Sequence, residues 1–478
     1  MLAIKYEAEL SKLQQRNKKL LEQNDDLTQR NQELENEIKR LKELLNSKGA
    51  SKGSKKPEFK LKYSLEKKQV SRKRRHKSTG RRNRTQKQTL VTATVDIYPT
   101  TAEPEDCVLQ AEQYAWRIIG GKSEYVRYNI FGRPESKTSP TVPGLRNRRS
   151  EYGLEIILIV AFLHYWIGIS IDHVCDVMRF FTGLDLPKSQ ADSLLTQLST
   201  DWSDQYNTIS ELLALQMVIY IDETGWKVGK QACYTWAFST TLHILFRCGV
   251  GRAKAEAQTI LGETFNGIGV SDDYGAYKNL FKTHQLCWAH LLRKAIKLML
   301  QHPDERQYAA FLEELYDIYQ QAVRFQRDQR LGVGRTDKVQ ELKARIIKLC
   351  TRSGQTIDPL KTPPDEATFI RLQNELIKGI ESLFVFVEHP EVEATNNRSE
   401  RNLRPEAEIR KGGRTSKSEN GANRRSIIMT VLATLNTRFE KFTLDKLLAE
   451  VAGWIDAGIS MFQLELNELK NAQAPPVS

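Results

Sequence analysis

Residues 217–226 read MVIYIDETGW and give the clearest indication of the architecture. The first five of these residues, 217–221, form a continuous apolar run that stops at Asp222. A short apolar run without polar alternation is typical of a buried central strand, because both faces of such a strand are covered. Two further runs, 232–240 and 243–250, are rich in β-branched and aromatic residues and predict an antiparallel meander with the first.

Helix and strand patterns alternate after this meander. A helix is expected over 253–261, followed by a short strand over 267–271 that ends at Asp272. Another strand is expected over 286–288, before the next helix. The order β-β-β-α-β-α-β-α is that of an RNase H-like fold, a mixed five-stranded sheet with flanking helices. In such a sheet the first and fourth strands are neighbours, so Asp222 and Asp272 are expected close together.

Helical periodicity surrounds this core. Residues 151–212 predict helices, with a break at Gly183 and a third helix capped by Ser189. Two helices joined by a Gly-containing turn are either a DNA-binding helix-turn-helix or part of an ordinary bundle. The expected organisation is 213–302 for the first part of the core, 303–392 for a large helical insertion, 393–440 for the second part of the core, and 441–478 for C-terminal helices and a tail.

Residues 1–47 have the heptad pattern of a leucine zipper. Leucine recurs at every seventh residue, which defines position d, and asparagine occupies three successive a positions. Buried asparagine at position a fixes register and favours a parallel dimer, although a single solvated helix is the alternative. The residues expected to mediate dimerisation are Leu13, Asn17, Leu20, Asn24, Leu27, Asn31, Leu34 and Leu41.

The positive charge of the chain is concentrated in one segment. The net charge is +13, whereas residues 48–88 hold 17 Lys or Arg and 2 acidic residues. Residues 48–90 lack apolar periodicity and predict a disordered basic linker that attracts a polyanion, unless it is only solvated. Residues 91–150 follow as a poorly defined connecting segment with one short strand. The linker's candidate DNA contacts are Arg72, Lys73, Arg74, Arg75, Arg81 and Arg82.

Composition argues against several classes of protein. The six cysteines are scattered and form no CxxC pair, which is typical of a reducing compartment rather than of a disulfide framework. The start of the chain is polar and charged, so no signal peptide is expected. The longest apolar run, 156–169, is too short for a bilayer, which needs about 20 residues. Membrane insertion is therefore not expected.

Asp222 and Asp272 fit a specific chemistry. Transfer of a phosphodiester requires stabilisation of an attacking and a leaving oxygen, which two Mg²⁺ ions can provide together. Mg²⁺ prefers oxygen ligands and keeps several waters, so a few carboxylates hold it. A lone aspartate at a strand end is more often a turn or cap residue. Two such residues in neighbouring strands favour the metal site.

Four segments resemble the signature blocks of IS66-family transposases: IDETGW (221–226), VSDDYGAY (270–277), CWAHLLRK (287–294) and NNRSERNLRP (396–405). The resemblance covers roughly residues 150–457. It implies a DDE transposase in which Asp222, Asp272 and Glu400 are catalytic and bind two Mg²⁺ (or Mn²⁺) ions. Asp273 stands where the family usually has glycine. The family pattern places the second aspartate two residues before Tyr274, so the resemblance implies that Asp272 is the ligand, and strand alternation should turn Asp273 to the opposite side.

Basic residues surround Glu400 in the sequence. Arg401 and Arg404 are expected to contact the DNA backbone, with ion pairing to Glu400 or Glu406 as the alternative. Residues 409–425 predict a flexible basic loop that clamps a strand end, or else a solvated surface loop. Its candidate DNA contacts are Arg410, Lys411 and Arg414.

Cys287 and His290 form a CxxH pair that also belongs to the family pattern. Zinc needs more ligands than such a pair supplies, so we interpret both residues as structural support behind the catalytic metals. Many relatives carry a cysteine-rich zinc segment after the coiled coil. Residues 91–150 contain only Cys107, and no zinc site is therefore expected.

The resemblance implies cleavage at the ends of an insertion sequence and strand transfer into target DNA. It also implies small helper proteins encoded by the same element and action on the nucleoid in a bacterial cytoplasm. An RNase H-like nuclease or resolvase that cuts without joining remains open, as does an inactive copy. A non-catalytic leucine-zipper regulator is disfavoured, because its basic region precedes the zipper, whereas here the basic region follows it.

Overall fold

The computed structural model describes residues 88–136, 139–358 and 361–473. The chain divides into two units, Met1–Arg81 and Arg82–Ser478, and the described residues all belong to the second. The leucine-zipper residues 1–47 and the basic positions 72–82 lie outside the described residues. The zipper and the linker contacts therefore stay predictions.

The segment 91–150 forms a three-stranded sheet, where the sequence indicated one short strand. Strands β2 and β3 are joined by Gly120 and Gly121, both at positive φ (56° and 81°), in a two-residue hairpin. Gly-Gly between two strands is a hairpin signal, because both glycines readily adopt the positive φ that the turn requires. The strand order is β1-β3-β2, with bounds β1 Ala93–Ile97, β2 Val108–Ile119 and β3 Lys122–Gly132.

Four helices follow this sheet. Ser170 caps α5 by accepting the backbone N–H of His173, and Gly183 ends it in the left-handed conformation (φ 75°). Ser189 is not a cap: α6 begins at Lys188 because Pro187 precedes it in extended conformation. The helices are α4 Leu154–Ala161 with a π-turn over Phe162–Trp166, α5 Ile171–Thr182, α6 Lys188–Asp201 and α7 Ser203–Ala214.

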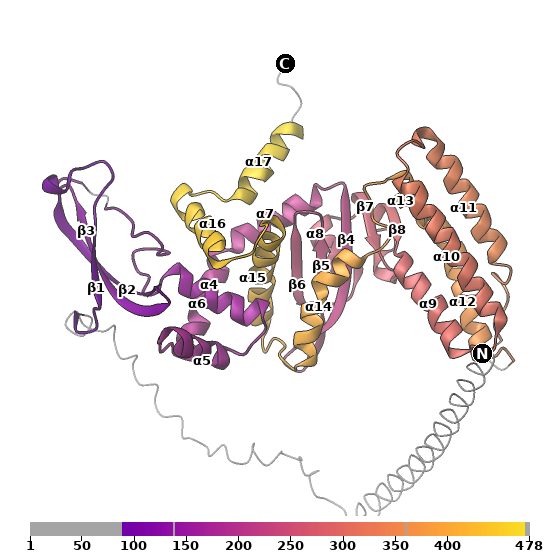
Figure 1. Ribbon diagram of the computed structural model, residues 1–478, viewed down its shortest axis with the longest axis horizontal. Coiled ribbons are helices and arrows are strands. Elements are labelled where there is room, and N and C mark those ends of the chain that lie inside the picture. The colour runs from indigo at the N-terminus through magenta and orange to yellow at the C-terminus, as the bar shows by residue number, and fades with distance from the viewer. Residues whose placement is uncertain (1–87, 137–138, 359–360, 474–478) are drawn as a thin grey trace, which may run out of the picture. The chain divides into compact units, whose positions relative to one another are not determined.

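A five-stranded mixed sheet forms the centre of the second unit (Figure 1). Its strand order is β6-β5-β4-β7-β8; β4, β5 and β6 are antiparallel, and β4, β7 and β8 are parallel. Its strands are β4 Val218–Val228, β5 Gln231–Ser239, β6 Ile244–Val250, β7 Phe265–Ser271 and β8 Phe281–Leu286. Helix α8, Lys254–Leu261, connects β6 to β7.

Two strand predictions differ from this sheet. Asp222 does not end β4, which continues as a hairpin arm with β5 after its pairing with β7 has stopped. The last strand is not 286–288 but β8, which is Phe281–Leu286. Its sequence FKTHQL is largely polar, so the apolar criterion selected the residues that follow it.

The two faces of β4 belong to different hydrophobic clusters. Ile219 and Ile221 pack with the helices that precede the sheet and with those at the C-terminus. Tyr220 instead joins Val270 and Leu286 in a cluster with the helical insertion. Side chains alternate along a strand, so Asp222 lies on the face of Tyr220.

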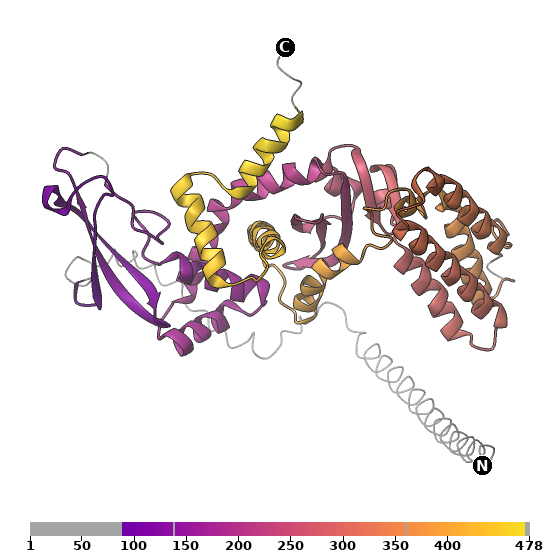
Figure 2. The same ribbon diagram turned by 45° about the horizontal axis from the view of Figure 1, so that its top comes forward.

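The helical insertion packs beside β7 and β8, as both views show (Figures 1 and 2). Its core is apolar, with Trp288, Leu315, Leu342 and Phe386 fully buried. The insertion and the helix that leads into it comprise α9 Trp288–Gln301, α10 Arg306–Arg327, α11 Arg335–Leu349, α12 Pro364–Lys378 and α13 Val385–Glu388.

Helix α15 covers the β6 edge of the sheet. Ser426, Thr430 and Thr434, four residues apart, accept hydrogen bonds from alternate backbone N–H groups of β6 at 2.9–3.1 Å. These hydroxyls satisfy donors that an open edge would offer to another strand. The C-terminal helices are α14 Asn397–Lys411, α15 Glu419–Arg438, α16 Leu444–Ala457 and α17 Met461–Gln473.

Within the described residues, no single helix is both long and apolar enough to cross a membrane. One bent pair, Leu444–Ala457 with Met461–Ala472, passes that test by length and composition only.

Candidate active site

The two aspartates are matched in register. Parallel pairing of β4 with β7 runs to Tyr220↔Val270, and Asp222 and Asp272 each come two residues later. Tyr220 and Val270 share the cluster on the insertion side of the sheet, so alternation along β4 places Asp222 on that side, and Asp272 directly follows Ser271, the last residue of β7. Backbone N–H groups hold each carboxylate: Glu223 donates to Asp222 Oδ1 (2.9 Å), and Tyr274 donates to Asp272 Oδ1 (3.0 Å).

Negative charge accumulates around Asp222. Its pKa rises to about 8, first because of burial and then because of the charges of Glu223, Asp272 and Glu400. These carboxylates come from β4, the end of β7 and α14. A site that gathers acids so closely favours a cation, and carboxylate oxygens are the ligands that Mg²⁺ takes. The residues present therefore fit a divalent cation.

Asp273 has different neighbours. The residue as a whole is exposed, but partial burial of its carboxyl group and the charge of Glu375 on α12 raise its pKa, while Lys294 on α9 lowers it. It is absent from the charges that act on Asp222. Asp272 and Asp273 therefore lie in different surroundings: the charge of Asp272 acts on Asp222, whereas Asp273 is influenced by Glu375 and Lys294.

A network of side chains begins at Glu223, the residue after Asp222. The Glu223 side chain is 2% exposed, and its Oε1 accepts a hydrogen bond from Arg252 Nε (2.8 Å) and forms an ion pair with Arg252 Nη2 (2.7 Å). Its Oε2 accepts the hydroxyl of Tyr277. The Arg252 guanidinium stacks on the ring of Tyr274, 3.7 Å from the centroid. Burial is the main cause that raises the pKa of Glu223.

Glu400 is held by anchors at the start of α14. The Asn396 side chain donates to the carbonyl of Ile221 (2.7 Å), and the Ser399 hydroxyl donates to the carbonyl of Ala237 (3.1 Å). Ile221 precedes Asp222 on β4, and Ala237 is paired with Asp222 on β5. These two hydrogen bonds therefore fix the start of α14 to the sheet beside Asp222. The Glu400 carboxylate accepts hydrogen bonds from Arg293 Nη2 at 2.8 and 2.9 Å.

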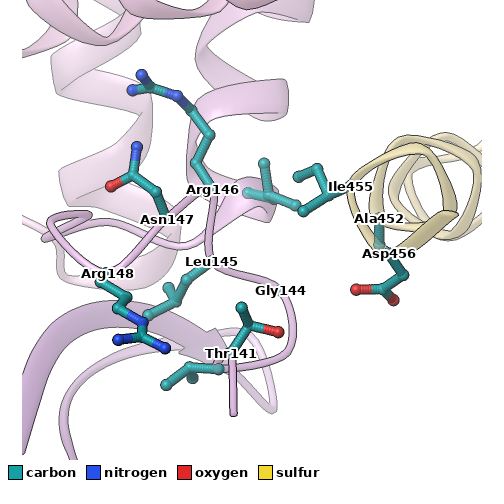
Figure 3. A pocket seen from close by; sticks show the side chains of 11 residues that line it. Thr141, Gly144, Leu145, Arg146, Asn147, Arg148, Ala452, Ile455 and Asp456 are labelled. Atoms are coloured by element: carbon teal, nitrogen blue, oxygen red, sulfur yellow. The ribbon is translucent and has the colours of Figure 1, made fainter. Parts of the chain in front are cut away.

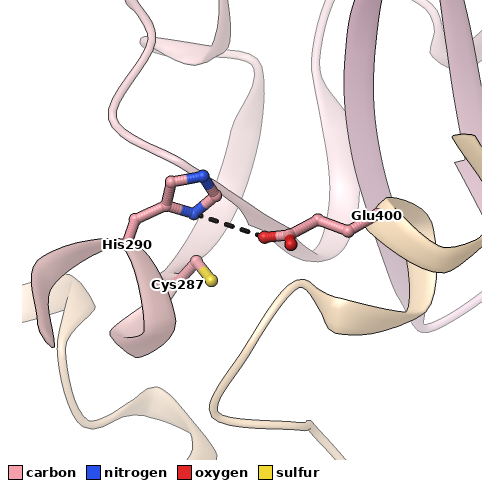
Figure 4. A group of neighbouring side chains, drawn as sticks. All are labelled: Cys287, His290 and Glu400. Atoms are coloured by element: carbon pink, nitrogen blue, oxygen red, sulfur yellow. Dashed lines mark ion pairs between the residues drawn. The ribbon is translucent and has the colours of Figure 1, made fainter. Parts of the chain in front are cut away.

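Cys287 and His290 meet Glu400 directly (Figure 4). The Sγ, ring nitrogen and carboxylate oxygen of these three residues all lie within 4.8 Å of one another. His290 Nδ1 is 3.6 Å from Glu400 Oε1, and Cys287 Sγ accepts the backbone N–H of Asn396 (3.1 Å). Among the described residues, this is the group of potential metal ligands whose atoms lie within 4.8 Å of one another. The carboxylates of Asp222, Asp272 and Glu400 do not all lie that close together.

The predicted DNA contacts near Glu400 fall into two groups. Arg401, Arg404 and Lys411 are exposed and have no ion pair among the described residues. Arg410 Nη1 instead donates to Thr224 Oγ1 (3.1 Å) and the carbonyl of Gly225 (2.7 Å). Arg414 Nη1 donates to the carbonyl of Gly168 (2.6 Å).

The expected loop over 409–425 is mostly helical. Helix α14 continues to Lys411 and α15 begins at Glu419, which leaves a short connection between them. Arg425 is buried in an ion pair with Glu406 rather than free for DNA. Sequence alone did not show this pairing, because the partners come from different helices.

A small pocket lies elsewhere, between the 141–148 loop and α16 (Figure 3). Its volume is about 30 Å³, and none of the carboxylates discussed above lines it.

Several residues of the site were not singled out from the sequence: Glu223, Arg252, Arg293 and Asn396. Three of them stand inside the segments IDETGW, CWAHLLRK and NNRSERNLRP, so the resemblance already contained that signal. Arg252 follows the β6 strand outside these segments and had no signal of its own.

Comparison with known protein families identifies the class to which the chain belongs. A model of the IS66 family of transposases matches residues 149–424, and transposases are nucleic-acid-processing enzymes. The match covers more than half of the chain, so the chain belongs to the IS66 transposase family. No curated protein matches it.

Proposed function

We propose that the chain is the DNA transposase of an insertion sequence, which cleaves DNA at the element ends and joins the freed 3′ ends to target DNA. The observation that carries this proposal is the matched register of Asp222 and Asp272, with Glu400 close enough to raise the pKa of Asp222. Membership of the IS66 family supports the same reaction.

The proposed fold of the core is RNase H-like. Three antiparallel strands followed by two parallel ones, in the order β6-β5-β4-β7-β8, support it. The helical insertion enters after β8 and α9, and α14 then returns to the sheet with the third acid.

Asp222, Asp272 and Glu400 are proposed to hold two Mg²⁺ (or Mn²⁺) ions. Such ions activate the attacking oxygen and stabilise the leaving one. The protein's own contribution is positioning: Glu223 and Arg252 brace the two aspartates, while Asn396 and Ser399 fix the first turn of α14. Arg293 pairs with Glu400 and offers a cation beside the site.

The proposed DNA path includes the exposed side chains Arg401, Arg404 and Lys411, which lie on the same helix as Glu400. Phosphate contacts of this kind position a duplex without reading its sequence. The basic residues 72–82 are proposed to add affinity. Dimerisation through residues 1–47, helper proteins of the element and action on a bacterial nucleoid complete the proposal.

A cleavage and joining assay tests this function. The substrate is DNA with the terminal repeats of the element, incubated with Mg²⁺ or Mn²⁺ and compared with EDTA. We expect metal-dependent cutting and joining, lost in Asp222→Ala and Glu400→Ala while DNA binding persists. Cutting without joining would favour a nuclease or resolvase. Binding without cutting under either metal would favour a non-catalytic regulator.

A further inference from the structure

A second kind of ligand set lies at the junction of α9 and α14. Cys287 precedes the first residue of α9, His290 lies in its first turn, and Glu400 lies in the first turn of α14. The two helix starts face each other, so a thiol, an imidazole and a carboxylate converge within 4.8 Å (Figure 4).

The imidazole of His290 supplies an independent observation. Its Nδ1 is buried and has no hydrogen-bond partner in the described part of the chain. The nearest oxygen of Glu400 is 3.6 Å away, which is too long for a hydrogen bond. Buried polar atoms almost always have partners, and a bound ion is one explanation of an exception. An ion bound by all three residues would satisfy this nitrogen.

The chemistry of the donors selects the ion. Thiolate and imidazole favour zinc and similar ions, whereas Mg²⁺ prefers oxygen ligands alone. Three protein ligands with one open position is a common arrangement for zinc. This set differs from the all-carboxylate set of Asp222 and Asp272, although Glu400 belongs to both.

The surroundings match those of a metal site. The backbone N–H of Asn396 donates to Cys287 Sγ (3.1 Å) and would stabilise a thiolate. Arg293 contacts both oxygens of Glu400, so one oxygen can bind an ion while the other keeps its hydrogen bond. Hydrogen bonds that orient ligands in this way are typical of protein metal sites.

We propose that Cys287, His290 and Glu400 form a binding site for a zinc-class divalent ion. An ion at this site fixes Glu400 beside α9. Glu400 is also the proposed third acid, so zinc at this site competes with the Mg²⁺ ions of Asp222 and Asp272 for the Glu400 carboxylate. This consequence alone rests on the proposed function.

The test uses the full chain, stripped of metal and titrated with Co²⁺, which replaces zinc and reports thiolate ligation by a sulfur-to-cobalt charge-transfer band. We expect the band in the wild-type chain, its disappearance in Cys287→Ser and its displacement by Zn²⁺. Cys107→Ser is the matched control, because Cys107 lies outside the cluster, and this variant should keep the band. Absence of the band in the wild-type chain, or an equal band in Cys287→Ser, would overturn the proposal.

Two more variants test the other ligands and keep the proposal falsifiable if Cys287→Ser does not fold. His290→Ala and Glu400→Gln should each keep the sulfur band but weaken Co²⁺ binding by about tenfold or more. Unchanged affinity in both variants would overturn the site. The readout is binding, so it stands apart from cleavage: a chain that fails to cut DNA can still show the band.

Discussion

Arg252 connects the two proposed catalytic aspartates without contacting either of them. It donates a hydrogen bond to and forms an ion pair with Glu223, the residue after Asp222, and it stacks on Tyr274, whose backbone N–H donates to Asp272. A single guanidinium therefore links the segments that carry both acids. Its planar fork and stacking are properties that lysine does not share.

We predict that Arg252→Ala lowers the cleavage rate by about 10–100-fold, the usual effect of removing a residue that orients metal ligands. The apparent Mn²⁺ requirement should rise in the same variant, which a general loss of stability would not cause. Arg247→Ala is the matched control, because Arg247 forms an ion pair with Glu256 nearby. Equal losses in the two variants would contradict a positioning role for Arg252.

His164 makes stability sensitive to acid. Its Nδ1 is 2.9 Å from the carbonyl of Ile169, so the nitrogen donates that hydrogen bond. Burial lowers the pKa of His164 from 6.5 to about 4. The unfolded chain therefore binds a proton between these values while the folded chain does not, and folding loses free energy as the pH falls from 6.5 towards 4.

We predict that His164→Asn, which retains a donor for Ile169, flattens this pH dependence. The difference between pH 7 and pH 4 should shrink by up to about 3 kcal/mol of unfolding free energy, the equivalent of the pKa shift. Urea unfolding at several pH values measures it. A variant whose pH dependence matches that of the wild-type chain would refute this account of His164.

At the scale of elements, the apolar run 217–221 predicted β4 and its central place correctly, because a buried strand must be apolar on both faces. The run did not predict where β4 ends. Beyond Asp222 the strand is held by its hairpin with β5, and cross-strand pairing leaves little trace in the residues TGWKV. Strand β8 was misplaced for a related reason, since FKTHQL is paired on one side only.

The candidate site was predicted unevenly. Asp222 and Asp272 follow strand patterns that are visible locally, and Glu400 came from the resemblance. Arg252 contacts Glu223, 29 positions away, and Arg293 contacts Glu400, 107 positions away. Contacts over such separations cannot be predicted from a local sequence pattern. Cys287 and His290 were interpreted as support, and their convergence with Glu400 depends on α14 returning to the sheet.

Helices α14 and α15 are joined by a buried ion pair. Glu406 and Arg425 side chains are 0% and 6% exposed, with two hydrogen bonds of 2.8 Å. The guanidinium also lies 5.0 Å from the Trp226 ring of β4. Removing one partner of such a pair leaves an uncompensated buried charge.

We predict that Glu406→Ala lowers the free energy of unfolding by about 3–5 kcal/mol. Glu211→Ala is the control: its pair with Lys470 is more than half exposed on both sides, and its loss should cost less than about 1 kcal/mol. Urea unfolding measures both variants. A loss for Glu406→Ala as small as that of the control would show that the pair does not hold the two helices together.

At the scale of the whole molecule, dimerisation through residues 1–47 is predicted from the heptads alone. Proline at position d breaks helix and seam together, so Leu20→Pro with Leu27→Pro should convert a dimer into a monomer. Light scattering on the full chain measures the mass, and Leu20→Met with Leu27→Met is a conservative control, because methionine keeps the volume of leucine without branching at Cβ. A dimer that survives the proline substitutions would place the interface elsewhere.

The central claim is that Asp222 and Asp272, matched in register, form a metal-dependent strand-transfer site with Glu400. The most direct measurement compares wild type, Asp272→Ala and Asp273→Ala in the cleavage and joining assay with Mg²⁺. We expect Asp272→Ala to abolish both steps and Asp273→Ala to retain them, because the main charges that act on Asp273 are those of Glu375 and Lys294 rather than those of Asp222 and Glu400. Full activity in Asp272→Ala, or loss only in Asp273→Ala, would contradict the central claim.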